Sequence, residues 1–354
     1  MNAELTLEHT LNHIAEGDQN AAAECRRRWD SIAKPLHSLG WMEDVCAIIA
    51  AAQHSSEIVT NKKILVPMCA DNGIVAEGVT QTGQEVTAIV AENFLDEKSC
   101  AAIMCRVSGA DIFPIDIGMA VDTPRVEKRK IAYGTKNFAK EPAMTKEEAV
   151  KALEVGIRLV GELKEKGYRL IATGEMGIGN TTTSSAVAAS LLGVPAEEMT
   201  GRGAGLSSAG LEKKISVIRD AIERWDLTKA DPLTVLSHVG GFDIAGICGM
   251  FLGGAYFHVP VLIDGFISSV GALLATRLAP ASVSYMIASH VSKEPAAHRI
   301  LNEIGLTPAL HASMCLGEGS GAVAVFPLIE MAANIYHKMS TFEQIQVEAY
   351  QELK

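Results

Sequence analysis

The stretch ILVPMCADNG, residues 64–73, has the pattern from which the fold class of this chain can be inferred. A short apolar run ends at Asp71, Asn72 and Gly73, which is the pattern of a buried strand that runs into a loop. We expect a strand here and in five further apolar runs, most of which end in Gly, Asp, Ser or His: DIFPIDIG (111–118), YRLIATGE (168–175), PLTVLSHVGG (232–241), VPVLIDG (259–265) and VSYMIASH (283–290).

Helical patterns lie between these runs. Thr145 and Glu148 have the spacing of a capping box, which predicts a helix that continues to about residue 166. Residues 181–192, 211–224 and 267–278 also have helical periodicity. Strands that alternate with helices in this way indicate an α/β fold, with a parallel sheet covered by helices on both faces. Ligands of such sheets bind where the strands end and the loops begin.

The two ends of the chain have helical patterns without strands between them. Residues 1–58 have helical spacing, broken at KPLHSLG (34–40), and residues 324–354 return to helix. We therefore expect a small helical domain built from 1–58 and 324–354, and a large α/β domain at 59–323.

Composition excludes several classes of protein. The chain has 354 residues, of which 48% are hydrophobic and 21% are charged, as in a globular protein. The net charge of −11 argues against a nucleic-acid surface, which needs a basic patch. The seven cysteines form no CxxC pair and the ten histidines have no metal-site spacing, so we expect neither a disulfide framework nor a zinc site.

Two segments bear on the location of the protein. The first residues, MNAELTLEHTLNHIAEG, are acidic and polar, so we expect no signal peptide and a cytoplasmic protein. The segment IAGICGMFLGGAYFHVPVLI (244–263) is nearly uncharged, but Asp243 precedes it and His258 and Pro260 interrupt it. We expect a buried helix followed by a buried strand, and no membrane span.

Two glycine-rich loops are typical of phosphate sites. TGEMGIGNTTTSSA (173–186) ends a strand and opens a helix, and a helix N-terminus attracts anions. GRGAGLSSAGLEKK (201–214) is a second such loop and ends in Lys213 and Lys214. Each pattern alone also fits a plain strand-to-helix turn, and neither is a P-loop or a GxGxxG motif. Together they favour a substrate that carries a phosphate.

Two glutamates occur beside glycines. Glu318 lies in LGEGSGA (316–322), and Glu175 follows Gly174. Paired carboxylates can bind a cation, share a proton or act on one substrate in different roles, but two unrelated loop glutamates fit the sequence as well. Asp243, Asp264 and the group Ser289, His290 and Ser292 also lie in loops, where each alone is more often a cap or turn residue.

A longer set of motifs resembles a known family. GEMGIGNTT, VGGFDIAG, IDGF, SHVS and LGEGSGA, in this order, resemble the nicotinate-nucleotide–dimethylbenzimidazole phosphoribosyltransferases, and ADNGIVAEGV and KPLHSLG are similar to their N-terminal motifs. The resemblance spans residues 30–337. It implies a Rossmann-like sheet with a small helical domain, usually as a homodimer. It also implies transfer of the phosphoribosyl group of nicotinate mononucleotide to an aromatic base, for cobalamin and related cobamides, without a metal or another cofactor.

The resemblance also implies roles for individual residues. Glu318 matches the general base, and Glu175 matches a second glutamate near the ribose and the base. The residues that match the surroundings of the nucleotide phosphate and ribose are Gly177, Asn180, Gly203, Lys214 and Ser292. Asp243 and Asp264 match family aspartates, for which a substrate contact and a structural hydrogen bond both remain open.

Departures from the family pattern concern the acceptor. Thr82 and Val90 align with Ser and Gln beside the acceptor, Met176 replaces a Leu, and Leu316 is the fourth acceptor candidate. The chain also reads KPLHSLGW and ADNG where common members read KPPGSLGR and ADHG, and it has Gly205 where Asn can occur.

These departures leave three functions open. In the first, the chain uses 5,6-dimethylbenzimidazole or an analogue as the acceptor. Alternatively it is specialised for phenolic acceptors such as phenol or p-cresol, as a homodimer or as a heterodimer with a paralogue. A third reading, a non-catalytic nucleotide-binding partner of an active paralogue, does not explain why both Glu175 and Glu318 are present.

Overall fold

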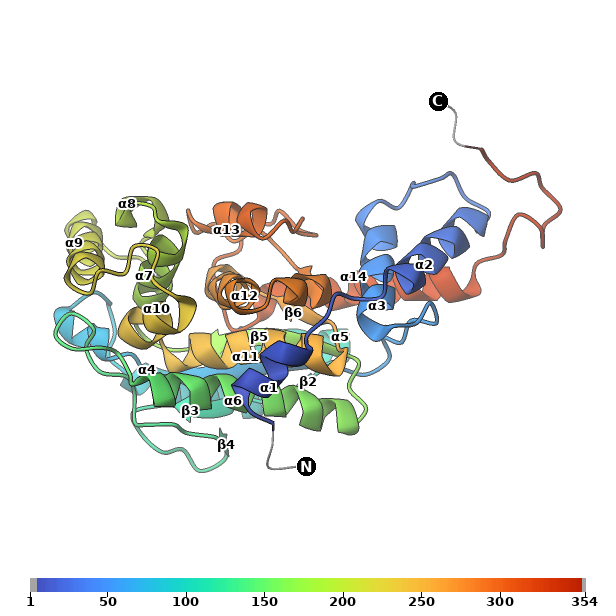
Figure 1. The fold of residues 1–354 in the computed structure, drawn as a ribbon. Helices are drawn as coiled ribbons and strands as arrows, with labels where there is room; N and C mark the ends of the chain where they lie inside the picture. Colours follow the sequence, from blue (N-terminus) through green and yellow to red (C-terminus); the bar gives the residue numbers. More distant parts are fainter. Residues whose placement is uncertain (1–4, 352–354) are drawn as a thin grey trace.

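The computed structural model describes residues 5–351, and its centre is a seven-stranded parallel sheet (Figure 1). The order is β4-β3-β1-β5-β6-β7, and β2 pairs with the first part of β1. All the strand pairs are parallel, and β1 pairs with β5 from Lys63 with Leu170 to Cys69 with Met176. The strands are β1 (Lys63–Ala70), β2 (Asp111–Ile112), β3 (Ile115–Gly118), β4 (Glu127–Lys128), β5 (Leu170–Met176), β6 (Val261–Ile263) and β7 (Met286–Ala288).

Helices surround the sheet. The α-helices are α1 (Leu7–His13), α2 (Gln19–Ser31), α3 (Trp41–Gln53), α4 (Glu85–Leu95), α5 (Cys100–Ser108), α6 (Lys146–Glu165), α7 (Asn180–Leu192), α8 (Ala196–Met199), α9 (Ser208–Arg224), α10 (Pro232–Val239), α11 (Phe242–Phe257), α12 (Phe266–Leu278), α13 (Ala297–Glu303) and α14 (Ser320–Lys338). Two 3₁₀ helices, η1 (Gly73–Glu77) and η2 (Pro280–Tyr285), complete the set.

Alternation along β1 builds a core on each face of the sheet. Ile64, Val66 and Met68 pack in a cluster that includes buried residues of α6, α7, α10, α11 and α12. Leu65 and Cys69 point to the opposite face, into a cluster with residues of α2, α3, α4, α5 and α14. Side chains of a strand alternate between faces, so a fully apolar strand is expected where both faces are covered. The predicted α/β class is confirmed.

Helices α6 and α11 pack unusually closely. A Cβ atom added to Gly249 of α11 would lie 2.0 Å from the carbonyl oxygen of Leu153 in α6. Small residues at such a crossing let two backbones approach, and α11 is buried along nearly its whole length. The expected helix and strand within 244–263 are confirmed. Within the described part of the chain, no helix is both long enough and apolar enough to cross a membrane.

Helices from both ends of the chain lie together. Figure 1 shows α2 and α3, in blue, beside α14, in red. The indole of Trp29 in α2 contacts the ring of Tyr336 in α14, and the Tyr336 hydroxyl donates to the carbonyl of Ser56 at 2.9 Å. The division at residues 58 and 324 stays a prediction, as does its description as a separate domain.

Several predicted elements were wrong. The run 232–241 is not a strand, since Pro232–Val239 form helix α10: the Asp231 side chain accepts a hydrogen bond from the Thr234 amide at 3.0 Å, and Pro232 occupies the first turn. The run 111–118 is two strands, separated at Pro114, and only Met286–Ala288 of 283–290 is a strand. The helix expected at 324–354 begins earlier, at Ser320, and ends at Lys338. Residues 1–4 and 352–354 lie outside the described part.

Candidate active site

The predicted site residues gather at the carboxyl ends of the central strands, in a cavity of about 270 Å³. Of the eleven predicted residues, nine line this cavity: Glu318, Glu175, Gly177, Asn180, Gly203, Ser292, Val90, Met176 and Leu316. Lys214 and Thr82 line a smaller adjoining cavity of about 90 Å³, whose wall shares Gly177, Asn180 and Thr181 with the first. The roles of these residues remain predictions.

A buried pair of carboxyl groups lies at the end of β5. Glu175 and Asp243 are 7% and 0% exposed. The Asn180 side-chain amide donates to both, to Oε2 of Glu175 and to Oδ2 of Asp243, the latter at 3.1 Å. Burial raises the pKa of Glu175 to about 8, with a further contribution from Asp243, and burial raises the pKa of Asp243 to about 7. Near neutral pH the pair therefore retains at least one proton.

Glu318 lies in the loop that precedes α14, at φ +62°. Its backbone N–H donates to Oε1 of Glu175 at 3.4 Å, and its own Oε2 accepts from the Ala101 amide at 3.1 Å, at the N-terminus of α5. Gly317 has φ +89°, a conformation that favours glycine, and a Cβ added there would lie 2.3 Å from Oε1 of Glu175. Burial raises the pKa of Glu318, and the hydrogen bond from Ala101 opposes the rise.

Asp264 has a structural part in holding this loop. The carboxylate accepts from the amides of Gly319, Gly321 and Ala322 at 3.2, 2.8 and 3.1 Å, which are orphan donors at the N-terminus of α14. A carboxylate at a helix N-terminus is favourable, and here it joins the end of β6 to the start of α14. Asp264 also lines the cavity, so a substrate contact remains open beside this structural role.

The opposite end of the site contains a buried lysine. Lys214 of α9 is 1% exposed, and its Nζ donates to Thr181 Oγ1 at 2.8 Å and to the Gly201 carbonyl at 3.2 Å. Burial lowers its pKa to about 8, so the ammonium is still mostly charged at neutral pH. The N-terminus of α7 lies beside it, and Gly177 in the preceding turn has no room for a side chain, since an added Cβ would lie 2.4 Å from the Ala70 carbonyl.

Three of the four acceptor candidates lie together. Val90 of α4, Met176 and Leu316 line the main cavity with Glu318, and Leu316 is 54% exposed. Thr82 does not join them, because it precedes α4 in an exposed loop and faces the smaller cavity.

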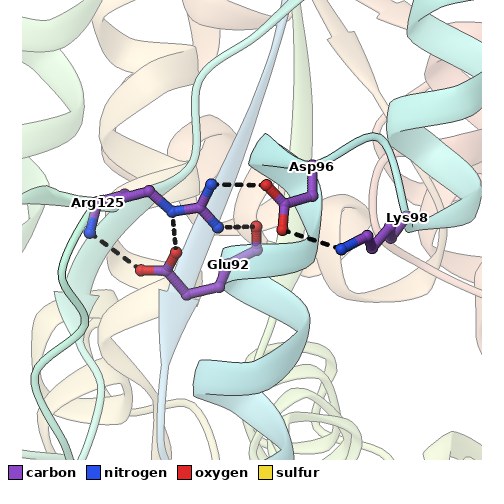
Figure 2. Close-up of polar contacts among 4 residues, drawn as sticks. All are labelled: Glu92, Asp96, Lys98 and Arg125. Carbon is purple, nitrogen blue, oxygen red and sulfur yellow. Dashed lines mark hydrogen bonds and ion pairs between the residues drawn. The ribbon is translucent and has the colours of Figure 1, made fainter.

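Polar contacts outside the cavity hold α4. In Figure 2, Arg125 bridges Glu92 of α4 and Asp96, the residue that caps the end of α4, with Nε to Glu92 Oε2 at 2.7 Å and one terminal nitrogen to Asp96 Oδ1 at 2.6 Å. Deeper in the fold, the Thr87 hydroxyl donates to Asp71 Oδ1 at 2.7 Å and accepts from the Ile178 amide at 3.2 Å. Helix α4, and with it Val90, is thus fixed from both sides.

The unusual N-terminal motifs have structural contacts. Asn72 of ADNG lies beside the site loop, and its side-chain amide donates to the Ile178 carbonyl at 3.4 Å. Lys34 of KPLHSLGW makes a buried ion pair with Glu43 at 2.7 Å.

Sequence reasoning missed several cavity residues. Thr181, Glu294 and Cys315 line the main cavity, and the Ala101 amide contacts Glu318. Of the serine–histidine group, His290 and Ser292 line the cavity, whereas Ser289 hydrogen-bonds to His290 Nδ1 at 3.1 Å. Thr181 follows Asn180 at the start of a helix, which was the available signal for it. Between residues 5 and 351, no group of three or more His, Cys, Asp or Glu side chains is arranged to hold a metal ion.

Comparison with known proteins identifies relatives along the whole chain. The model of a family described as "Phosphoribosyltransferase" matches residues 14–347. The nicotinate-nucleotide–dimethylbenzimidazole phosphoribosyltransferases of Ruminiclostridium cellulolyticum and Clostridium acetobutylicum are 45% and 44% identical, over 99% of this chain and 100% of each relative. The crystal structure of CobT from Thermus thermophilus is similar with a TM-score of 0.89 and 37% identity, covering 94% of this chain and 100% of that one. The family expected from the motifs is confirmed: this chain belongs to the phosphoribosyltransferase family that its named relatives represent.

Proposed function

We propose that this enzyme transfers the phosphoribosyl group of nicotinate mononucleotide to an aromatic base, giving an α-ribotide and nicotinate for cobamide assembly. One observation carries the proposal: Glu175 and Glu318 line a cavity that adjoins a buried lysine at the N-terminus of a helix. The names of the relatives support the same substrates, nicotinate nucleotide and dimethylbenzimidazole.

Glu318 is proposed as the general base. A benzimidazole attacks C1′ of the ribose through one ring nitrogen and must lose the proton of the other nitrogen. The partly buried Glu318 carboxylate is a stronger base than a solvated one, because burial raises its pKa. The apolar wall formed by Val90 and Met176 would hold the flat ring beside it.

Glu175 is proposed to orient the substrate. With a pKa of about 8, its carboxyl group is mostly protonated at neutral pH and can donate a hydrogen bond to the ribose or the base. The leaving nicotinate needs no acid, because its cationic ring nitrogen takes the electrons of the C1′–N bond and departs neutral. Attack from the opposite face converts the β-linked nucleotide to an α-linked product.

The nucleotide phosphate is proposed to bind at the other end of the site. The Lys214 ammonium, the amides at the start of α7 and the glycine-rich loop around Gly203 supply positive charge and N–H donors. Ser292 adds a hydroxyl in the same cavity. The Asn180 amide already contacts two carboxyl groups, which supports a role in positioning Glu175 more than in binding phosphate.

The test is turnover by the purified protein. Nicotinate mononucleotide is incubated with a panel of acceptors, and released nicotinate and α-ribotide are quantified. Product with 5,6-dimethylbenzimidazole or another aromatic base supports the proposal. The lack of product with every acceptor would favour the non-catalytic nucleotide-binding alternative.

A phenolic acceptor is the second candidate. Val90 and Leu316 place apolar side chains beside Glu318 and offer no side-chain hydrogen bond, so the cavity favours rings with few polar groups away from the reacting atom. A phenol has one reacting oxygen, and Glu318 would take its proton as the C1′–O bond forms. Measurable transfer to phenol or p-cresol supports this candidate.

We also propose that the enzyme is a dimer that pairs through α5 and α14. Ile103 and Val107 of α5 are 51% and 84% exposed, Met331 of α14 is 49% exposed, and the two helices pack side by side. Exposed apolar patches of this kind mark interaction surfaces. Val107→Glu should shift the purified chain toward monomer in sedimentation analysis; a wild-type monomer contradicts the homodimer and leaves the heterodimer with a paralogue. The cytoplasmic location stays a prediction.

A further inference from the structure

Glu294 is a carboxylate of the main cavity to which the mechanism above assigns no role. It lies in the loop between β7 and α13, is partly buried, and lines the same cavity as Glu175 and Glu318. It follows Ser292 by two residues, and its backbone amide donates to Ser292 Oγ at 3.3 Å. Its position is therefore coupled to a residue at the proposed nucleotide end of the site.

The surroundings of Glu294 fix its carboxylate near the phosphate loop. A Cβ added to Gly201 would lie 1.8 Å from Oε2 of Glu294, so the carboxylate lies directly against that backbone. The Gly201 carbonyl accepts from Lys214 Nζ at 3.2 Å. Burial raises the pKa of Glu294, and the charge of Lys214 opposes the rise.

The carboxylate of Glu294 has no hydrogen-bond donor among the described residues. A partly buried carboxylate with free acceptor sites in a ligand cavity is expected to find its donors on the ligand. A mononucleotide offers few: its phosphate is anionic and is repelled, the nicotinate carboxylate is anionic too, and the ring nitrogen carries no proton. Only the ribose hydroxyls are neutral donors, and a carboxylate can accept from two adjacent hydroxyls at once.

We infer that Glu294 accepts hydrogen bonds from the vicinal ribose hydroxyls of the nucleotide, and that it selects ribonucleotides over 2′-deoxyribonucleotides. The inference rests on the proposed function, because it takes a nicotinate nucleotide as the ligand. It assigns Glu294 to substrate selectivity, and leaves the chemistry at C1′ to Glu318.

The test compares nicotinate mononucleotide with its 2′-deoxy analogue. Affinities are measured by calorimetry without acceptor, and kcat/KM is measured with a benzimidazole. The wild type should favour the ribonucleotide by about 10- to 100-fold, as expected for a hydrogen bond to a charged group. Glu294→Gln and Glu294→Ala should reduce this ratio about tenfold or more, chiefly by weakening the ribonucleotide. Glu212→Gln, which removes an exposed carboxylate from α9, is the matched control and should keep the wild-type ratio.

The outcomes separate this inference from the proposed function. A wild type that binds both nucleotides equally overturns the inference. This measurement needs no variant, so the test does not depend on whether the variants fold. Equal weakening of both nucleotides by Glu294→Gln also overturns it, because a residue that only tunes Lys214 would act on the phosphate common to both. A wild type that selects the ribonucleotide in calorimetry, loses that selectivity on Glu294→Gln, and releases no nicotinate supports the inference while the proposed transfer fails.

Discussion

Replacing Asp243 with Asn should stabilise the protein at alkaline pH and much less in acid. The Asp243 carboxyl is 0% exposed, and burial raises its pKa from 3.8 to about 7. A carboxyl whose pKa is raised by folding contributes its stability below its ordinary pKa, and that contribution is lost as the pH rises through the folded value. Above pH 7 the folded protein must therefore hold a buried charge that the Asn variant lacks.

The size of the effect follows from the shift. A rise of about three pKa units corresponds to about 4 kcal/mol between the fully protonated and fully ionised limits. Between pH 5 and pH 8, the ionisation of Asp243 lowers the free energy of unfolding of the wild type by about 2–3 kcal/mol. Asp243 accepts hydrogen bonds from the Asn180 amide and the Ile244 N–H on its two oxygens. Asn has only one such oxygen, so the variant loses one hydrogen bond, and its free energy of unfolding falls by about 1 kcal/mol at every pH.

The measurement is urea unfolding of the wild type and Asp243→Asn at pH 5 and pH 8. The lost hydrogen bond has the same effect at both pH values and cancels when the two are compared. Relative to the wild type, the free energy of unfolding of the variant should therefore be about 2–3 kcal/mol higher at pH 8 than at pH 5. Asp30→Asn, the same change at an exposed position of α2, should show no such difference. Equal effects of Asp243→Asn at both pH values would contradict this prediction, because they would mean that Asp243 ionises in the folded protein at its ordinary pKa.

Three further predictions concern the site. Glu318→Gln keeps the size of the side chain but removes the proton acceptor, so turnover should fall by about 10²–10⁴-fold while nucleotide affinity stays near the wild-type value; normal turnover of benzimidazole contradicts the role of base. Lys214→Ala should weaken nicotinate mononucleotide by about 1.5–3 kcal/mol in calorimetry and leave the acceptor KM nearly unchanged. Equal weakening of both substrates by Lys214→Ala would indicate a structural role for Lys214. Because the Lys214 pKa is about 8, wild-type nucleotide affinity should also decrease as the pH rises above that value. Val90→Gln should shift competitive kcat/KM from phenol toward benzimidazole, and an unchanged ratio removes Val90 from the acceptor site.

The fold was predictable from local patterns where they had no competitor. The run at residues 64–73 is buried on both faces and has no helical cap, so its strand was unambiguous. The run at 232–241 has similar hydrophobicity, but Asp231 and Pro232 form a helix start, and this signal outweighs the apolar run. Apolar runs of this length fit a strand and a buried helix equally well, and only the residues at their ends separate the two.

The site was predictable where its motifs are local. Glu175 is among the last residues of β5, and Gly177 and Asn180 follow that strand directly, so their proximity could be predicted from their spacing alone. Glu294 was not predictable, because its setting depends on contact with Gly201, far away in the chain. Thr82 was grouped with Val90, but α4 begins only at Glu85, so the two positions are not on one rigid element.

Helix α14 connects the terminal helices to the loop that holds Glu318. It contains 19 residues and is therefore about 28 Å long. Glu318 lies in the loop just before the first residue of the helix, Ser320. The other end is bound to α2 and to the segment before β1 through Tyr336 and the ring of His337, which contacts the Ile58 carbonyl at 3.0 Å. A tilt of about 2° about the far end moves the near end by about 1 Å, a displacement large enough to disturb proton transfer. If Glu318 is the base, as proposed, substitutions between α2 and α14 should therefore change the distance between its carboxylate and the proton of the acceptor.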